Sequence, residues 1–166
     1  YGLTNWRGMG DFVIVGMKNY ANLIKQGTLF NSMGNTIKYT LFVVIWGNIK
    51  ALALAMILSM KLKARGVFRT IFYIPALFST IVVAFLWSYV YAPHYGMISE
   101  IFNLFGSSNA PNLLGSKATS LFAAAFVETW KTSGTMTIIY LAGLQNISEE
   151  VIESAKIDGC NGWQAI

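Results

Sequence analysis

Three ionisable side chains interrupt segments of the chain that are otherwise long and apolar: Lys50, Glu128 and Lys131. Glu128 and Lys131 are three residues apart, so on a helix they share a face and can pair. Lys50 can also pair with Glu128 if their two segments run to a similar depth. Ionisable groups in such surroundings usually face a bundle interior or a water-filled path. The pattern therefore allows either structural neutralisation or a polar lining for a solute path.

Catalytic and cofactor patterns are missing from the sequence. There is no G-x-x-x-x-G-K-S/T phosphate loop, no H-E-x-x-H pair, one Cys and one His, which is His94 beside Pro93. Phosphate loops and zinc sites need those residues at those spacings. We therefore predict no catalytic residue, no metal and no cofactor, and the chain cannot bind ATP through a loop of that kind.

A second candidate site is the short segment that begins at Ser148. Ser148 is a favourable N-cap, and Glu149 and Glu150 suit the positive end of a helix dipole. The following apolar positions form one stripe: Val151, Ile152 and Ala155. Gly159 then permits a sharp turn that other residues resist. The segment is predicted to be an amphipathic helix that docks on a partner or folds back on its own bundle.

Composition places these candidates in a membrane protein. Of 166 residues, 12 are basic and 7 acidic, so 11% are charged, and 55% are hydrophobic. An ordinary soluble domain has about 25% charged residues. Nucleic-acid-binding and disordered chains need many more charges, so neither class fits. The same scarcity argues against a soluble enzyme.

Three segments are long and apolar enough to cross a bilayer. They run from about residue 35 to 60, 72 to 92 and 118 to 145, and the interval between Arg69 and Glu100 has no charged residue. A hydrocarbon core of about 30 Å needs about 20 apolar helical residues. Buried helices of a soluble protein are the alternative, but three such segments exceed the needs of one small core. We expect an all-α, polytopic helical bundle surrounded by membrane lipid.

Orientation follows from residues 61–69, which contain four bases and no acid. The positive-inside rule places this linker in the cytoplasm. Residues 93–117 then lie outside, and the last segment returns to the cytoplasm. The predicted organisation is an extracytoplasmic stretch at 1–33, a transmembrane core at 34–147 and a cytoplasmic segment at 148–166.

Smaller features predict how the helices are shaped and packed. Small residues recur every four positions along the first span: Gly47, Ala51, Ala55 and Ser59. Such a face lets a neighbouring helix approach closely. Pro75 predicts a break between a short cytoplasmic helical piece and the span after it. Apolar residues at helical spacing from Met97 to Phe105, followed by Gly106, predict a short helix at the outer membrane interface.

The segment from Glu153 to Gly159 resembles the EAA loop of binding-protein-dependent ABC transporter permeases. The usual pattern is Glu-Ala-Ala, two residues, then Asp-Gly-Ala, and this chain departs from it at Ser154 and Cys160. It also has Ser148 where Pro is common. Further matches are Val15–Tyr20, Asn35–Thr36, Arg69–Pro75 and Leu141–Ile147. Together they look like the maltose- or glycerol-phosphate-type subunits of carbohydrate importers.

The resemblance implies a type I importer permease with a MetI-like fold in the bacterial inner membrane, as a multi-pass protein of which this chain is a fragment. Expected partners are a second permease subunit, two ATP-binding subunits and a periplasmic solute-binding protein that delivers a sugar or polyol, with no nucleic acid. Carried over by position, the residues of the ATPase-coupling loop would be Glu153, Ala155, Asp158 and Gly159. Two other readings are an ATP-independent channel or secondary transporter, which would use the three buried charges, and a membrane scaffold.

Overall fold

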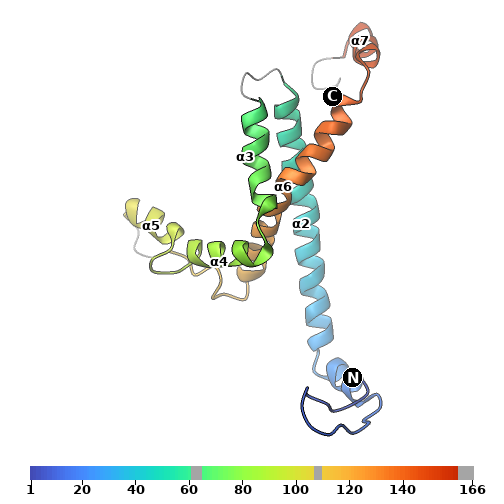
Figure 1. Cartoon of the computed structure of the whole chain (residues 1–166), viewed down its shortest axis with the longest axis vertical. Helices are drawn as coiled ribbons and strands as arrows, with labels where there is room; N and C mark the ends of the chain where they lie inside the picture. Colours follow the sequence, from blue (N-terminus) through green and yellow to red (C-terminus); the bar gives the residue numbers. More distant parts are fainter. Residues whose placement is uncertain (61–64, 107–109, 161–166) are drawn as a thin grey trace. The chain divides into compact units, whose positions relative to one another are not determined.

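The computed structural model describes residues 1–60, 65–106 and 110–160 (Figure 1). Part of the predicted basic linker, at 61–64, lies outside the described residues, as do 107–109 of the predicted outer loop and 161–166 of the cytoplasmic segment. The helices are α1 (Lys18–Lys25), α2 (Thr28–Ser59), α3 (Arg65–Leu77), α4 (Thr80–Val90), α5 (Met97–Leu104), α6 (Ser120–Gln145) and α7 (Glu149–Ile157). The described residues contain no strand, only an isolated bridge from Thr4 to Ile14. The all-α prediction is confirmed.

The chain divides into two compact units, Tyr1–Leu41 and Phe42–Ile166. In the first unit, an irregular N-terminal stretch folds over the start of α1. The Asn19 side-chain amide donates hydrogen bonds to the carbonyl oxygens of Gly2 and Thr4, both at 2.9 Å. The indole N–H of Trp6 donates to the carbonyl of Gly10 at 3.0 Å. These bonds satisfy backbone groups that a chain without regular structure would otherwise leave unpaired.

α2 is a continuous helix of 32 residues without proline, and its most apolar stretch has a mean hydropathy of 2.1. Among the described residues it is the one unbroken helix long and apolar enough to cross a membrane. At 1.5 Å per residue it extends about 48 Å, which exceeds a hydrocarbon core. Only 22% of its most apolar stretch is buried. A soluble core would bury far more of such a helix, so its exposed apolar surface fits a lipid environment.

The segment predicted as a single span at 72–92 is instead two helices, α3 and α4, which meet at a bend of 100° (Figure 1). The break lies at Phe78 and Ser79, not at Pro75, which is buried within α3. Proline lacks the N–H donor and crowds the preceding turn, so the helix ends shortly after it. Ser79 has extended backbone angles, and its hydroxyl accepts a hydrogen bond from the Val82 N–H at 3.3 Å. α4 therefore starts as a separately capped helix of 11 residues.

α3 packs directly on α6 because Gly134 leaves room for the α3 backbone. A Cβ atom at Gly134 would lie 2.7 Å from the Cα of Tyr73 and would also collide with the Phe72 carbonyl. The two helices therefore touch backbone to backbone at this crossing. One face of α6 is buried by such contacts, and its members are mostly small: Ala123, Ala125, Thr129, Ser133, Gly134, Thr137 and Leu141.

The predicted small-residue face of α2 is confirmed. Gly47, Ala51 and Ala55 are buried, together with Leu58, and Ser59 is half-buried. At Gly47 a Cβ would lie 3.7 Å from the methyl group of Thr129, so α6 covers this part of the face. Further along, Ala55 and Leu58 join Leu141 of α6 in an apolar cluster, against which Phe72, Tyr140 and Leu144 pack.

The predicted helix before Gly106 is also present. α5 ends at Leu104, and Gly106 follows with φ of +79°, the left-handed conformation that often ends a helix. The Gly106 N–H bonds to the Asn103 carbonyl at 2.9 Å. Met97, Ile101 and Leu104 are exposed. The location of α5 at a membrane interface remains a prediction, which this exposed apolar surface supports.

We expect Gly134→Ala to destabilise the protein, because the added methyl group must push α3 away from α6. Overpacking of this kind typically costs about 1–3 kcal/mol. Thermal denaturation of the detergent-solubilised full-length protein, followed by size-exclusion chromatography, measures the effect. Gly143→Ala is the matched control, since α6 has open space around that position. Equal melting midpoints for the two variants would contradict the crossing.

Candidate functional site

Lys50 of α2 contacts α6 through its ammonium group. Its Nζ donates a hydrogen bond to the carbonyl oxygen of Thr129 at 2.5 Å, and the lysine is half-buried. Close by along the same two helices, the hydroxyl of Tyr140 donates to Oδ1 of Asn48 at 2.5 Å. The α2–α6 interface therefore combines a small-residue face with two interhelical hydrogen bonds. Hydrogen bonds between helices in a bilayer typically contribute about 0.6–2 kcal/mol each.

Lys131 of α6 extends in another direction, to the start of α4. Its Nζ donates to the Thr80 hydroxyl oxygen at 2.6 Å. Within the described residues no ion pair joins Glu128 to Lys50 or Lys131, so the ion pairs considered from the spacing are not formed. The reason is geometric: Lys50 reaches a backbone carbonyl one residue beyond Glu128, and Lys131 reaches a different helix. Whether these three residues line a path remains a prediction.

A stripe of hydroxyl residues on α6 was not singled out from the sequence. Thr129, Ser133 and Thr137 recur every four residues and are buried. Each hydroxyl donates back to a carbonyl of its own helix, at 2.9, 2.8 and 2.7 Å respectively. Bonded in this way, the side chains act as small, nearly apolar residues, so neighbouring helices can approach. The same spacing rule that identified the α2 face would have found them if hydroxyl residues had been counted as small.

The predicted turn at Gly159 is confirmed. α7 ends at Ile157, and Gly159 follows with φ of +82°. The Cys160 N–H donates to the Ala155 carbonyl at 3.0 Å, and the Asp158 N–H donates to the Ser154 carbonyl at 3.0 Å. This pattern, with a left-handed glycine two positions after the last helical residue, is a Schellman motif. It fixes the direction in which the chain leaves α7.

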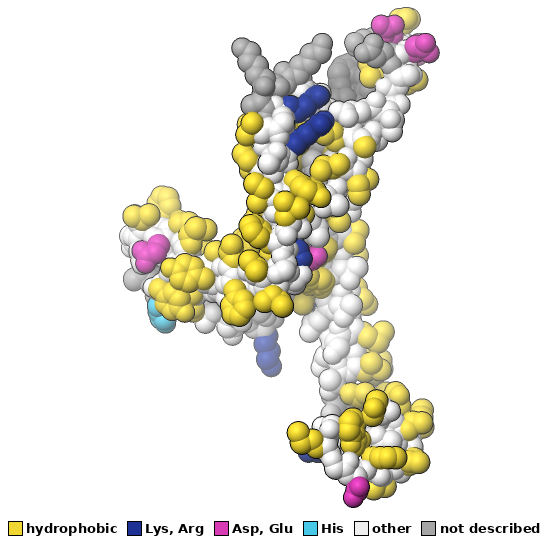
Figure 2. Space-filling model, viewed as in Figure 1, with side chains coloured by type: hydrophobic (Ala, Val, Ile, Leu, Met, Phe, Trp, Pro, Cys, Tyr) yellow, Lys and Arg dark blue, Asp and Glu magenta, His cyan; other side chains and the backbone are white. Residues whose placement is uncertain are grey.

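α7 exposes apolar side chains. Val151 is 60% exposed and Ile157 is 86% exposed, while Ile152 and Ala155 are half-buried. The described part of the chain therefore leaves Val151 and Ile157 uncovered, and both docking on a partner and folding back on the bundle remain predictions. Glu153 and Asp158 are exposed beside them, and Figure 2 shows acidic side chains on α7. The helix presents a mixed apolar and acidic surface.

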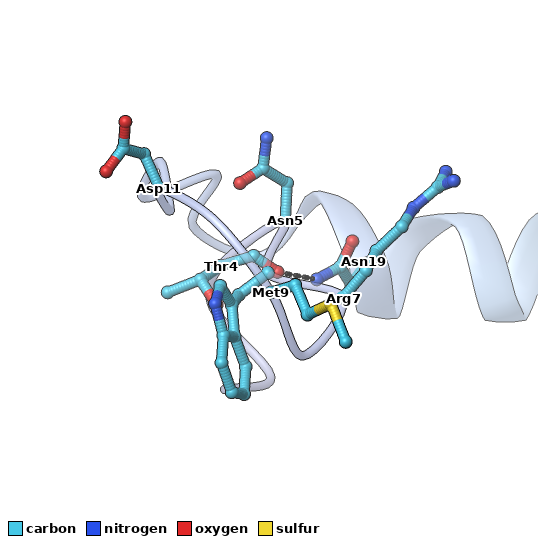
Figure 3. Close-up of a pocket in the computed structure, with 7 residues that line it drawn as sticks. Thr4, Asn5, Arg7, Met9, Asp11 and Asn19 are labelled. Atoms are coloured by element: carbon cyan, nitrogen blue, oxygen red, sulfur yellow. Dashed lines mark hydrogen bonds between the residues drawn. The ribbon is translucent and has the colours of Figure 1, made fainter.

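Hollows elsewhere on the described chain include two of contrasting polarity. One, of about 370 Å³, is apolar and is lined by Trp87, Tyr91, Ile98, Leu113, Thr119, Phe122, Ala123 and Phe126. The other, of about 590 Å³, is polar and lies in the N-terminal unit around Thr4 and Asn19. Figure 3 shows that Asn5, Arg7 and Asp11 around it point away from one another, so they do not converge on a common ligand. Within the described ranges, no group of three His, Cys, Asp or Glu residues could hold a metal ion.

The arrangement of helices is the fold of bacterial ABC importer permeases. The chain aligns with the crystal structure of a bacterial ABC transporter involved in the import of the acidic polysaccharide alginate, with a TM-score of 0.79 and 23% identity over 90% of this chain and 52% of that one. A second structure, the bacterial alginate ABC transporter in complex with an alginate pentasaccharide-bound periplasmic protein, gives a TM-score of 0.80 at 23% identity.

Residues 44–166 match the family described as binding-protein-dependent transport system inner membrane component, and the chain belongs to this family. It is 30% identical, over 99% of its length, to the probable starch degradation products transport system permease protein AmyD of Thermoanaerobacterium thermosulfurigenes. It is 35% identical, over 90% of its length, to the trehalose/maltose transport system permease protein MalF of Thermococcus litoralis. The resemblance noted in the sequence is thus confirmed. The chain spans about half the length of these relatives, 55% and 50%.

We expect Lys50→Glu to destabilise the assembled protein, because it would place a carboxylate against the Thr129 carbonyl oxygen. Adding Glu128→Lys should not restore stability, since the partner of Lys50 is backbone. The double variant should therefore be no more stable than either single variant. Thermal denaturation of both single variants and the double variant measures their stabilities, and Lys50→Arg, which keeps the donor, is the control. Recovery of most of the lost stability in the double variant would favour an ion pair instead.

Proposed function

We propose that this chain is part of the transmembrane permease subunit of an ATP-driven importer in the bacterial inner membrane. The solute is a sugar or related polyol, delivered by a periplasmic binding protein. A second permease subunit completes the path, and two ATP-binding subunits hydrolyse ATP. Support for the sugar comes from relatives whose names specify starch degradation products and trehalose or maltose. Support for the binding protein comes from the family description and from the structure of the related complex.

The observation that carries the proposal is the geometry of α7 and its turn, within the part of the chain that matches the family. An exposed helix with apolar residues and acids, closed by Gly159, is suited to dock on another protein. Glu153, Ala155, Asp158 and Gly159 form the proposed coupling segment. α6 leads into α7 through Asn146, Ile147 and Ser148 alone. Movement of a docked ATP-binding subunit would therefore reach the membrane helices through a short connection.

The proposed path runs along α6, where Lys50, Glu128 and Lys131 supply polar groups. The ammonium groups of Lys50 and Lys131 each donate a hydrogen bond to an uncharged oxygen atom, and neither forms an ion pair with the described residues. Polar groups kept at membrane depth are usually retained for a function such as a solute path. Alternating access then requires two arrangements of these helices that bind the solute and ATP differently.

Cross-linking through Cys160 tests the coupling role. The full-length protein is studied in membranes that contain its natural partners, with any other cysteine removed and a photo-activated cross-linker attached to Cys160. We expect it to capture an ATP-binding subunit, because the thiol follows the turn of α7. Leu104→Cys in a Cys160→Ser background is the control, since Leu104 is exposed on α5 at the opposite predicted side. Capture of lipid alone from Cys160, despite efficient labelling, would favour the carrier or scaffold readings.

Substitutions at Gly159 test whether its backbone conformation is needed. Gly159→Val should abolish most ATP-dependent uptake, because a β-branched residue in the left-handed conformation costs about 1–2 kcal/mol or more and the turn would rearrange. Gly159→Asn should keep most uptake, since Asn tolerates this conformation. Uptake into proteoliposomes, with expression and ATP hydrolysis measured beside it, separates coupling from folding. Normal uptake by the Val variant would remove the turn from the mechanism.

A further inference from the structure

The start of α4 is held from both sides. Ser79 caps the helix through its hydroxyl, and the next residue, Thr80, accepts a hydrogen bond from Lys131 at 2.6 Å. Thr80 and Lys131 are 51 residues apart in the chain. The bond therefore joins the helix after the 100° bend to α6, the helix that leads to the proposed coupling segment.

The position of Lys131 on α6 is fixed by the fold. Lys131 precedes Gly134 by three residues, so both lie on nearly the same face of the helix. At Gly134 the backbone of α6 touches that of α3. The helix contact at Gly134 fixes the position of the Lys131 backbone. The hydrogen bond to Thr80 fixes the position of the Lys131 ammonium group, so the flexible side chain between them is held in place.

The ammonium group of Lys131 keeps binding capacity after this bond. It has three N–H donors, and the structure assigns one of them to Thr80. Within the described residues no carboxylate forms an ion pair with it. Its other donors can therefore bind oxygen atoms of a solute, and sugar hydroxyl and ring oxygens are suitable acceptors.

We propose that Thr80 is a positioning residue: its hydroxyl holds the Lys131 ammonium so that the free donors bind the solute in the path. This inference rests on the proposed function, since it assigns a role in solute binding. Thr80 does not itself contact the solute; it acts through Lys131.

The test measures ATP-dependent uptake by the complete transporter in proteoliposomes. The probe is whichever of radiolabelled maltose, trehalose or a starch-derived maltodextrin the wild-type protein imports. Thr80→Val keeps the shape but removes the hydroxyl, and it should raise the KM for uptake about three- to tenfold, the effect of one lost hydrogen bond. Maximal rate and ATP hydrolysis should change by less than twofold. Thr80→Ser should restore the wild-type KM.

Further variants show whether Thr80 acts through Lys131. Lys131→Met should raise the KM at least as much, and adding Thr80→Val to it should have no further effect. Thr70→Val is the matched control, because the Thr70 hydroxyl bonds only within α3, to the Gly66 carbonyl. If Thr80→Val does not assemble, Thr80→Ala and Thr80→Ser are compared in the same way.

The outcomes separate this inference from the proposed function. An unchanged KM in Thr80→Val, failure of Thr80→Ser to restore it, or additive effects with Lys131→Met would overturn the positioning role while ATP-driven uptake stands. An unchanged KM in Lys131→Met would do the same. If the wild-type transporter imports no sugar or polyol in an ATP-dependent manner, these three probes included, the proposed sugar function fails, and the inference fails with it.

Discussion

The contact between the backbones of α6 and α3 at Gly134 is the constraint on which the packing of the helices in this protein depends. In a bilayer, helices gain nothing from leaving lipid for one another, so association relies on close packing and hydrogen bonds between helices. Gly134 allows α6 to touch α3 at Phe72 and Tyr73. The small face of α2 meets α6 at Gly47 through side chains, with the Thr129 methyl group at ordinary contact distance. Both contacts use α6, which therefore organises the three-helix core.

Several polar side chains of this core form hydrogen bonds rather than ion pairs within the described residues. The hydroxyls of Thr129, Ser133 and Thr137 bond to their own helix, and Lys50 and Lys131 bond to neutral oxygens. An ammonium group bonded to a carbonyl or hydroxyl keeps its positive charge available to a ligand, whereas an ion pair would neutralise it. In the proposed transporter, this charge would be available to a solute in the path.

α6 also joins the two parts of the proposed mechanism. Along one helix it carries the carbonyl that binds Lys50, the side chain of Lys131 and the crossing at Gly134, and it ends three residues before α7. The buried face of α6 contrasts with the exposed apolar residues of α7, Val151 and Ile157. In the proposed transporter, a packed helix of this kind would transmit the movement of a docked partner to the bend between α3 and α4.

The sequence by itself determined the local features of this protein: the helical class, the small face of α2, the turn at Gly159 and the family to which the chain belongs. Each depends on residue type and on spacing within about one helical turn or one short motif. Only the tertiary structure decided the partners of Lys50 and Lys131, the break at Phe78 and Ser79 rather than at Pro75, and the role of Gly134. These features depend on which helices are in contact and on which residues along each helix face one another. A long lysine side chain can reach several acceptors, and the spacing of residues along one helix does not determine the distances to residues of another helix. The interhelical contacts are therefore determined by the tertiary structure.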